Sequence, residues 1–162
     1  MISHRPHLNI IALVRQPRSV YADIQMPGDK RNVSAALAET IIALRPSIVS
    51  HACKSTGTGF FGAHIAGATL PHTVEHLAID LLVERFSKDF LSSASDDNGA
   101  RRGHASSPTF AGATTWLDRA TGCMRVRVGC TSSDPADYLK ATEDALVDAV
   151  ALMNRLLADF PE

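Results

Sequence analysis

Hydrophobic positions near both ends of the chain follow the two-residue period of β-strands. Residues 8–14 form a short apolar run and residues 20–26 alternate, so together they predict a first hairpin. Residues 109–116 and 123–131 predict a second hairpin, with the turn at 118–122. Connections this short join neighbouring antiparallel strands. The pattern therefore predicts an antiparallel sheet built from two hairpins.

Four other segments carry apolar residues three and four positions apart, which is the spacing of one helix face. These segments are residues 31–44, 60–66, 69–84 and 135–157. Pro46 follows the first segment, Pro71 suits the first turn of the third, and Pro135 suits the start of the last. The chain is therefore predicted to follow the order β-β-α-(α)-α-β-β-α.

This order predicts an α+β fold in which the helices pack against one face of an antiparallel sheet. The chain has 162 residues, which is the size of one domain with a proper core, so residues 1–162 are expected to form a single domain. Residues 87–108 interrupt the pattern, because they are rich in Ser, Asp and Gly and have few apolar side chains to bury. We expect them to form a mobile loop inserted into the domain.

Composition adds mainly exclusions. Hydrophobic residues make up 45% and charged residues 20% of the chain, which is typical of a soluble globular protein. A net charge of −1 gives no reason to expect nucleic acid or an anionic membrane as a partner. No apolar run reaches about 18 residues, no signal-peptide core is evident, and the three cysteines form no Cys-x-x-Cys pair, so a cytoplasmic protein is expected. The expected partner is a peptide-like or small-molecule substrate, and a homo-oligomer stays open.

The predicted helix 69–84 contains the motif His-x-x-Glu-His, formed by His72, Glu75 and His76. One helical turn brings positions three and four apart onto the same side, so both imidazoles can point at one spot with the carboxylate beside them. Two neutral ring nitrogens can bind zinc, and a carboxylate can take a proton from a metal-bound water. The motif therefore predicts a zinc site with Glu75 as the catalytic base.

The rest of this helix predicts where the imidazoles point. His72 and His76 share a face with Ile79 and Val83, so this face is expected to be turned toward the apolar interior. A stripe of Thr73, Asp80 and Glu84 is expected to face solvent instead. A buried pair of histidines that are only hydrogen-bonded is the alternative to a metal site.

Candidates for a third ligand lie elsewhere in the chain. Glu143 sits on the flank of the apolar stripe of the last helix, from which it can face the metal helix across the core, although a salt bridge would also satisfy it. Cys53 and His51 are weaker candidates, because they lie in a polar connecting segment. Cys123 and Cys130 lie seven positions apart on one predicted strand and should face opposite sides of the sheet, so they cannot jointly hold a metal.

Three stretches together resemble a known family. They are the run from Arg5 to Ile10, the segment His51-Ala52-Cys53 with the glycines that follow it, and the helix from Leu70 to Leu81. In these stretches the chain resembles the N-terminal domain of cyanophycin synthetases, which has a similar His-x-Cys and a Val-Glu-His helix. The likeness covers most of the chain except residues 87–108, and the metal helix is its most specific part.

The inverted order of the motif, called inverzincin, and the order of hairpins and helices are similar to the pitrilysin and S-ribosylhomocysteinase metallohydrolase fold. In that resemblance the third ligand is a Glu on a later helix in the peptidases and a Cys in the lyase. The resemblance implies a zinc-dependent hydrolase of a peptide or isopeptide bond, in metabolism of an Asp/Arg polymer of the cyanophycin type. Two alternatives stay open: a non-catalytic polymer-binding or peptide-binding module with a structural metal or none, and a lyase acting on a small thioether.

Overall fold

The structure is a computed structural model that describes residues 7–26, 31–54, 59–93, 108–131 and 136–159. Within these ranges the chain forms one antiparallel four-stranded sheet, a two-stranded ribbon and three α-helices. The predicted α+β fold with a single small domain is confirmed.

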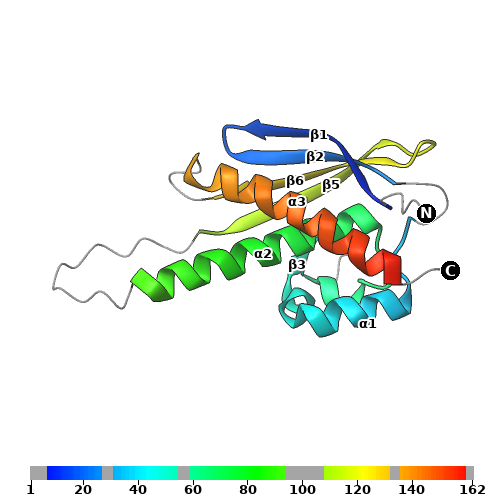
Figure 1. Cartoon of the computed structure of the whole chain (residues 1–162), viewed down its shortest axis with the longest axis horizontal. Coiled ribbons are helices and arrows are strands. Elements are labelled where there is room, and N and C mark those ends of the chain that lie inside the picture. Colours follow the sequence, from blue (N-terminus) through cyan, green and yellow to red (C-terminus); the bar gives the residue numbers. More distant parts are fainter. Residues whose placement is uncertain (1–6, 27–30, 55–58, 94–107, 132–135, 160–162) are drawn as a thin grey trace, which may run out of the picture.

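The sheet joins the two predicted hairpins through their inner strands. Its strand order is β1-β2-β6-β5 and every neighbouring pair is antiparallel. The first hairpin consists of β1 (Asn9–Gln16) and β2 (Ser19–Gln25), and the second of β5 (Phe110–Asp118) and β6 (Cys123–Cys130). Because β2 pairs with β6, strands β1 and β5 lie at the two edges of the sheet (Figure 1).

Two long helices, α2 (Leu70–Ser93) and α3 (Ala136–Asp159), pack side by side on the same face of the sheet (Figure 1). Helix α2 contacts β5 and β6, whereas α3 contacts mainly β1 and β2. The third helix, α1 (Ala35–Leu44), lies on the side of the long helices that is away from the sheet. The observed arrangement agrees with the expectation that the helices cover one sheet face.

In the described residues between α1 and α2, all the elements are short. The 3₁₀ turn η1 (Pro46–Ser50) packs against α1 and α2, and it leads into the ribbon of β3 (Ala52–Cys53) and β4 (Gly59–Phe60). A second 3₁₀ turn, η2 (Phe61–Ala63), follows, where a short α-helix over 60–66 was expected. A 3₁₀ turn is the shorter form that irregular connections commonly adopt.

Helix α1 starts later than its apolar pattern indicated, because Ser34 caps it. The Ser34 hydroxyl accepts a hydrogen bond from the Leu37 amide at 3.2 Å, which satisfies one of the free N–H groups of the first turn. The expected start near residue 31 is therefore corrected to Ala35. The end at Leu44, just before Pro46, agrees with the expectation.

Helix α2 extends further than expected. Residues 87–93 belong to the helix, so the prediction that a loop begins at residue 87 is wrong. Phe86 contributes to this, because its ring packs on Phe110 of β5 and Tyr138 of α3, with centroid distances of 5.6 and 4.7 Å. This contact holds α2 against both neighbours close to residue 87. The rest of the predicted loop, residues 94–107, lies outside the described residues.

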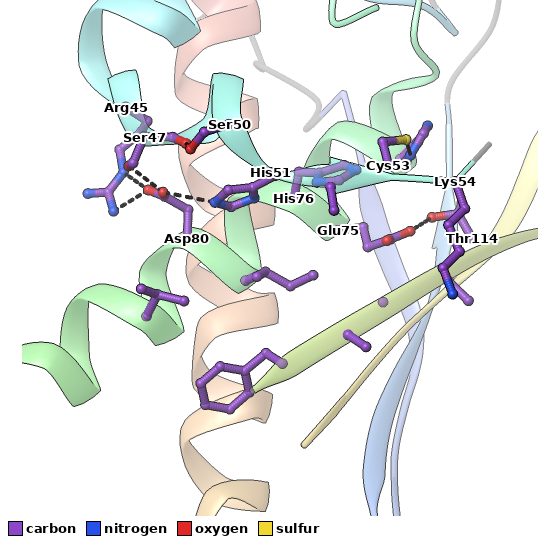
Figure 2. A pocket seen from close by; sticks show the side chains of 18 of the residues that line it. Arg45, Ser47, Ser50, His51, Cys53, Lys54, Glu75, His76, Asp80 and Thr114 are labelled. Atoms are coloured by element: carbon purple, nitrogen blue, oxygen red, sulfur yellow. Dashed lines mark hydrogen bonds and ion pairs between the residues drawn. The ribbon is translucent and has the colours of Figure 1, made fainter. Parts of the chain in front are cut away.

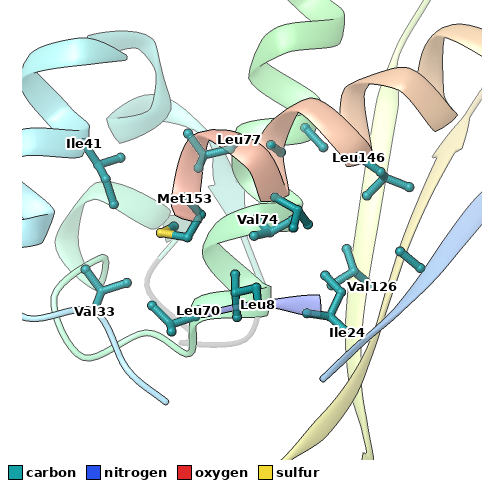
Figure 3. Close-up of a cluster of buried hydrophobic side chains, with 14 of the residues drawn as sticks. Leu8, Ile24, Val33, Ile41, Leu70, Val74, Leu77, Val126, Leu146 and Met153 are labelled. Carbon is teal, nitrogen blue, oxygen red and sulfur yellow. The ribbon is translucent and has the colours of Figure 1, made fainter. Parts of the chain in front are cut away.

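The core lies between the sheet and the two long helices. The even-numbered residues of β2 and β6 point toward the helices and are buried there, as the strand period requires. Figure 3 shows side chains from sheet and helices in contact across this layer: Ile24, Val126, Val74, Leu77, Leu146 and Met153. None of the described helices is long and apolar enough to cross a membrane.

Candidate metal centre

Two short stretches bring the candidate ligands together. Helix α2 carries His72, Glu75 and His76, while the extended segment at β3 carries His51 and Cys53. Alternate residues of an extended chain point the same way, so His51 and Cys53 both face α2, whereas Ala52 between them is exposed. The two stretches therefore bring their side chains together, and Figure 2 shows His51, Cys53, Glu75 and His76 close to one another.

Three of these side chains form a group that can hold a metal ion. One ligand atom from each of Cys53, His72 and His76 lies within 4.8 Å of the other two. The Cys53 Sγ is 3.5 Å from His72 Nε2, and the two imidazole rings of the helix are 5.0 Å apart. We call Cys53, His72 and His76 the ligand group.

His76 distinguishes a metal site from a pair of merely hydrogen-bonded histidines. His76 is only 3% exposed, and neither of its ring nitrogens has a hydrogen-bond partner among the described residues. Buried ring nitrogens are normally satisfied by a hydrogen bond or by a metal. The geometry of His76 therefore favours the metal site over the alternative.

The surroundings also keep the imidazoles neutral and hold them in place. Burial, followed by the charges of His72 and His51, lowers the pKa of His76 to about 3, and burial lowers the pKa of His72. The neutral imidazole is the form that binds metal. The Phe61 ring stacks on His76 with a centroid distance of 3.9 Å and an interplanar angle of 15°, which limits the movement of that ligand.

Glu143 is not brought to the ligand group, and this expectation is corrected. Its carboxylate accepts a hydrogen bond from Arg15 Nε in a salt bridge at the β1 side of α3. Helix α3 packs over β1 and β2, so the flank that carries Glu143 faces the edge strand instead of α2. Cys123 and Cys130 lie at the two ends of β6, on alternating faces, and neither belongs to the ligand group.

Glu75 faces β5 beside the ligand group. Its carboxylate accepts a hydrogen bond from the Thr114 hydroxyl, and the residue is 6% exposed. Burial raises the pKa of Glu75 to about 7, although the hydrogen bond from Thr114 opposes this shift. A Cβ atom at Gly112 would lie 2.4 Å from Glu75 Oε1, so a larger residue at this position of β5 would displace the carboxylate.

The stripe of α2 that was expected to face solvent is largely buried. Thr73 is 0% and Asp80 3% exposed, while Val83, expected to be inside, is 47% exposed. At Asp80 the reason is that η1 packs against α2, and Ser47 of η1 donates a hydrogen bond to the Asp80 carboxylate. Thr73 donates its hydroxyl hydrogen to the Thr69 carbonyl at 3.2 Å, which satisfies it in the buried position.

Asp80 is the centre of a buried polar network. Its carboxylate accepts hydrogen bonds from Arg45 Nε and Ser47 Oγ, and lies 3.3 Å from His51 Nε2. Burial alone would raise the pKa of Asp80, but the hydrogen bonds from His51, Ser47 and Arg45 and the charge of Arg45 hold it below its usual range. Arg45 also pairs with Glu84, so it neutralises charge on two turns of α2.

The ligand group, Glu75 and the Asp80 network line one cleft of about 1120 Å³. The cleft runs between α2, the edge strand β5 and the segment from α1 to β3. Its apolar walls are supplied by Leu44, Ile79, Val83 and Phe110. A cleft of this size, with a few converging polar groups, is large enough to admit a small ligand.

Comparison with protein-family models, with curated proteins and with solved structures finds no significant match to this chain. The likeness to cyanophycin synthetases therefore stays a prediction that rests on sequence motifs.

Sequence reasoning ranked Cys53 below Glu143, although a signal for Cys53 was present. His51 and Cys53 are two positions apart, and in an extended segment this spacing points both side chains to one side. The same segment contributes to the family resemblance. No comparable signal identified Thr114 or Gly112, because their role depends on the packing of β5 against α2.

Proposed function

We propose that this protein is a zinc-dependent hydrolase of a peptide or isopeptide bond. The observation that supports this most is that the Glu75 carboxylate and the ligand group line the same cleft. A hydrolase of this kind needs an ion with an open position and a general base beside it. Both requirements can be met by side chains of α2 and β3.

The donor set favours zinc among the common metals. Cys53 offers a thiolate and the two histidines offer imidazole nitrogens, and zinc is commonly bound by sulfur and nitrogen ligands of these kinds. Catalytic zinc sites characteristically have three protein ligands, whereas structural sites have four. Zinc held by the ligand group would supply a Lewis acid that polarises a substrate carbonyl and makes water more acidic.

The residues of the chain have separate tasks in this proposal. Glu75 accepts the proton that water loses as it attacks the carbonyl carbon, and later gives it to the leaving nitrogen. Thr114 orients the carboxylate through its hydroxyl, and Gly112 leaves the space that the carboxylate occupies. Phe61 holds the His76 ring in its position in the ligand group.

The family resemblance suggests which substrates to test first. These are the Asp/Arg polymer and its β-linked aspartyl-arginine unit, whose isopeptide bond is an amide of the proposed class. The size of the cleft agrees with a ligand as large as a dipeptide.

The experiment is Glu75→Gln, which keeps the shape of the side chain and removes the base. Zinc content should be unchanged, because the ligand group is intact, and the rate of hydrolysis should fall by roughly a hundredfold or more. Glu143→Gln is the matched control, since it makes the same chemical change on α3 outside the cleft and should leave the rate unchanged. Equal rates for wild type and Glu75→Gln would exclude Glu75 as the base. Zinc-loaded wild type that binds the polymer and cleaves none of these substrates would be a binding module.

A lyase is the second candidate, because the ligand group contains a cysteine. In the resemblance described above, the lyase differs from the peptidases in having a Cys as its third ligand. Here Cys53 precedes the metal helix, and it is brought to His72 by the β3 ribbon. Release of a free thiol from S-ribosylhomocysteine by the zinc-loaded protein would favour the lyase, and no release would exclude it.

A further inference from the structure

The cleft that contains the ligand group also has an apolar patch, formed by Leu44, Ile79, Val83 and Phe110. Ile79 and Val83 continue the face of α2 that carries His76, three and seven positions further along the helix. A rise of about 1.5 Å per residue places them about 5 Å and about 10 Å from His76 along the helix axis. The patch therefore begins one helical turn away from the ligand group.

A hydrogen bond between α1 and α2 holds two members of the patch near each other. Arg45 Nη1 donates to Glu84 Oε2 at 2.6 Å. Leu44 precedes Arg45 at the end of α1, and Val83 precedes Glu84 on α2. The bond therefore keeps Leu44 and Val83 at the same end of the cleft.

Phe110 supplies another wall at this end. Its ring stacks on Phe86 with a centroid distance of 5.6 Å, and it meets Tyr138 edge-on at 6.0 Å. Phe86 lies three positions after Val83 on α2, so Phe110 is held beside the same part of that helix. These aromatic contacts fix the ring, and Phe110 is nevertheless only half-buried.

Two members of the patch are exposed although they are apolar. Leu44 is 54% and Val83 47% exposed, and neither packs into the hydrophobic core. Single exposed apolar side chains are common on protein surfaces. These two, however, line one cleft together with the half-buried Ile79 and Phe110. Covering them with apolar atoms of a ligand would remove this surface from water, which favours binding.

The charged side chains near the patch bind one another. Arg45 pairs with both Asp80 and Glu84, and Asp80 is only 3% exposed. A charged ligand group would have to compete with these pairs, whereas an apolar side chain would leave them intact. Figure 2 shows Arg45 and Asp80 on one side of His76 and Glu75 on the other. The patch therefore lies at the end of the cleft away from Glu75.

Building on the proposed function, we infer that the apolar patch is a specificity subsite, which binds the apolar side chain of a residue next to the scissile amide. The patch, the ligand group and Glu75 line one continuous cleft. One helical turn from His76 is also a distance that the side chain of a neighbouring residue can span. The substrate class is then a peptide or isopeptide with a side chain such as that of leucine beside the bond. The charged head group of arginine in β-aspartyl-arginine suits this subsite less well.

The experiment measures how tightly probes with different side chains bind. One series is β-aspartyl-leucine, β-aspartyl-alanine and β-aspartyl-arginine, in which the variable residue follows the amide. The other is N-acetyl-leucyl-glycine with its alanine and arginine counterparts, in which that residue precedes it. All are titrated into the zinc-loaded Glu75→Gln protein, where turnover is too slow to disturb the equilibrium. In one of the series the leucine probe should bind roughly tenfold or more tightly than the other two.

The preference for leucine should depend on the patch. Adding Leu44→Ser or Val83→Ser should lower it by roughly threefold or more, and adding both should bring it near unity. Both positions are exposed, so folding and zinc content should not change. The matched controls are Leu117→Ser and Val147→Ser, at positions that are 46% and 43% exposed and do not line the cleft. Both controls should preserve the preference.

Several results would overturn the inference. They are equal binding of the leucine and alanine probes in both series, tighter binding of the arginine probe, no measurable binding of either leucine probe, and a preference that survives the double substitution. Sedimentation of the wild type provides a further test, because a dimer that Leu44→Ser with Val83→Ser dissociates would make the patch a subunit interface instead.

The proposed hydrolase activity is judged separately, because it depends on rates in wild type and Glu75→Gln. A leucine preference in binding without hydrolysis by the wild type would keep the subsite and reject the hydrolase. Hydrolysis without any such preference would keep the hydrolase and reject the subsite.

Discussion

The two long helices, α2 and α3, have the same length of 24 residues and lie on the same face of the sheet, yet they bury different side chains. Among the side chains that the structure describes, helix α3 buries an apolar stripe and a single polar residue, Thr142, whose hydroxyl donates to the Tyr138 carbonyl at 2.7 Å. Helix α2 buries an apolar stripe as well, and in addition four polar or charged residues: Thr73, Glu75, His76 and Asp80.

The difference follows from what covers each helix. Helix α2 has β5 and β6 on one side and η1 on another, so positions on more than one face become buried. Burying polar groups costs free energy unless each one finds a partner. Thr73, Glu75 and Asp80 have protein partners, whereas the ring nitrogens of His76 have none among the described residues. His76 is therefore the exception on a helix whose other buried polar residues have partners, and this exception marks the candidate site.

Buried leucines of the two helices should contribute about equally to the free energy of unfolding. Leu77 of α2 and Leu146 of α3 are both 0% exposed, so Leu77→Ala and Leu146→Ala should each lower the free energy of unfolding by about 2–5 kcal/mol through cavity formation. Denaturant unfolding measures this. Val147→Ala, at an α3 position that is 43% exposed, is the control and should change it by less than about 0.5 kcal/mol. A loss below about 1 kcal/mol at either buried leucine would break the equivalence.

Substitutions on the two helices should differ in their effect on metal binding, because among the described residues α2 contributes two ligands and α3 none. Cys53→Ser, His72→Ala and His76→Ala should each weaken zinc binding by more than about a hundredfold, which is the upper range for residues that only support a ligand. Competition with a chelator of known affinity measures this. Cys130→Ser, at a buried cysteine outside the ligand group, should leave the affinity unchanged. The assignment of Cys53, His72 and His76 as zinc ligands would be wrong if all three variants kept the wild-type affinity.

The packing of α2 against β5 should be tight enough that one added methyl group lowers the rate of hydrolysis. In Gly112→Ala the new Cβ would lie 2.4 Å from Glu75 Oε1, so the carboxylate has to move. The rate of hydrolysis should then fall by roughly tenfold to a hundredfold, as expected for displacement of a catalytic group by about 1 Å, with zinc retained. Thr115→Ala, on the opposite face of the same strand, is the control. An unchanged rate in Gly112→Ala would show that Glu75 needs no fixed position.

Charged residues on the two helices should differ in their effect on stability. Asp80→Asn should lower the free energy of unfolding by about 1–3 kcal/mol, because it disturbs hydrogen bonds to a buried carboxylate. Asp144→Asn removes an exposed pair with Lys140 on α3 and should cost less than about 0.5 kcal/mol. Urea unfolding of both variants tests the difference, and equal losses would contradict it.

The stability of wild type and of Asp80→Asn should also depend differently on pH. Since the pKa of Asp80 is held below its usual range, its ionised form stabilises the fold above the pKa of the unfolded chain. That stabilisation is lost as the pH falls through the lower pKa of the folded state. The stabilities of wild type and Asp80→Asn should therefore converge in acid, and a difference that stays constant would indicate another cause.

Periodic patterns in the sequence were sufficient for most of the fold. The two hairpins and the two long helices follow from alternation and helical spacing, which depend only on neighbouring residues. The His72 and His76 pair belongs to the same class of information, because one turn of a helix fixes their relation. These features could be predicted because no distant contact is needed to define them.

The remaining features depend on contacts between segments that are distant in sequence. Cys53 and His72 are 19 positions apart in the sequence. The helical pattern alone does not indicate that β3, and not the flank of α3, supplies a side chain next to His72. For the same reason Asp80 was expected in solvent, since the turn that covers it belongs to another segment. Glu143 shows the converse case, because its pairing with Arg15 depends on which strands lie under α3.

The pairing of β2 with β6 also has a consequence for how the chain folds. Each hairpin can form from nearby residues, but joining them requires contacts such as the one between Asp23 and Arg125, which are 102 positions apart. Bringing such distant residues together loses chain entropy before the new contacts compensate for it, and folding rates fall as the average sequence separation of contacts grows. We therefore expect the pairing of β2 with β6, whose register has no bulge, to be the step that limits the speed of folding.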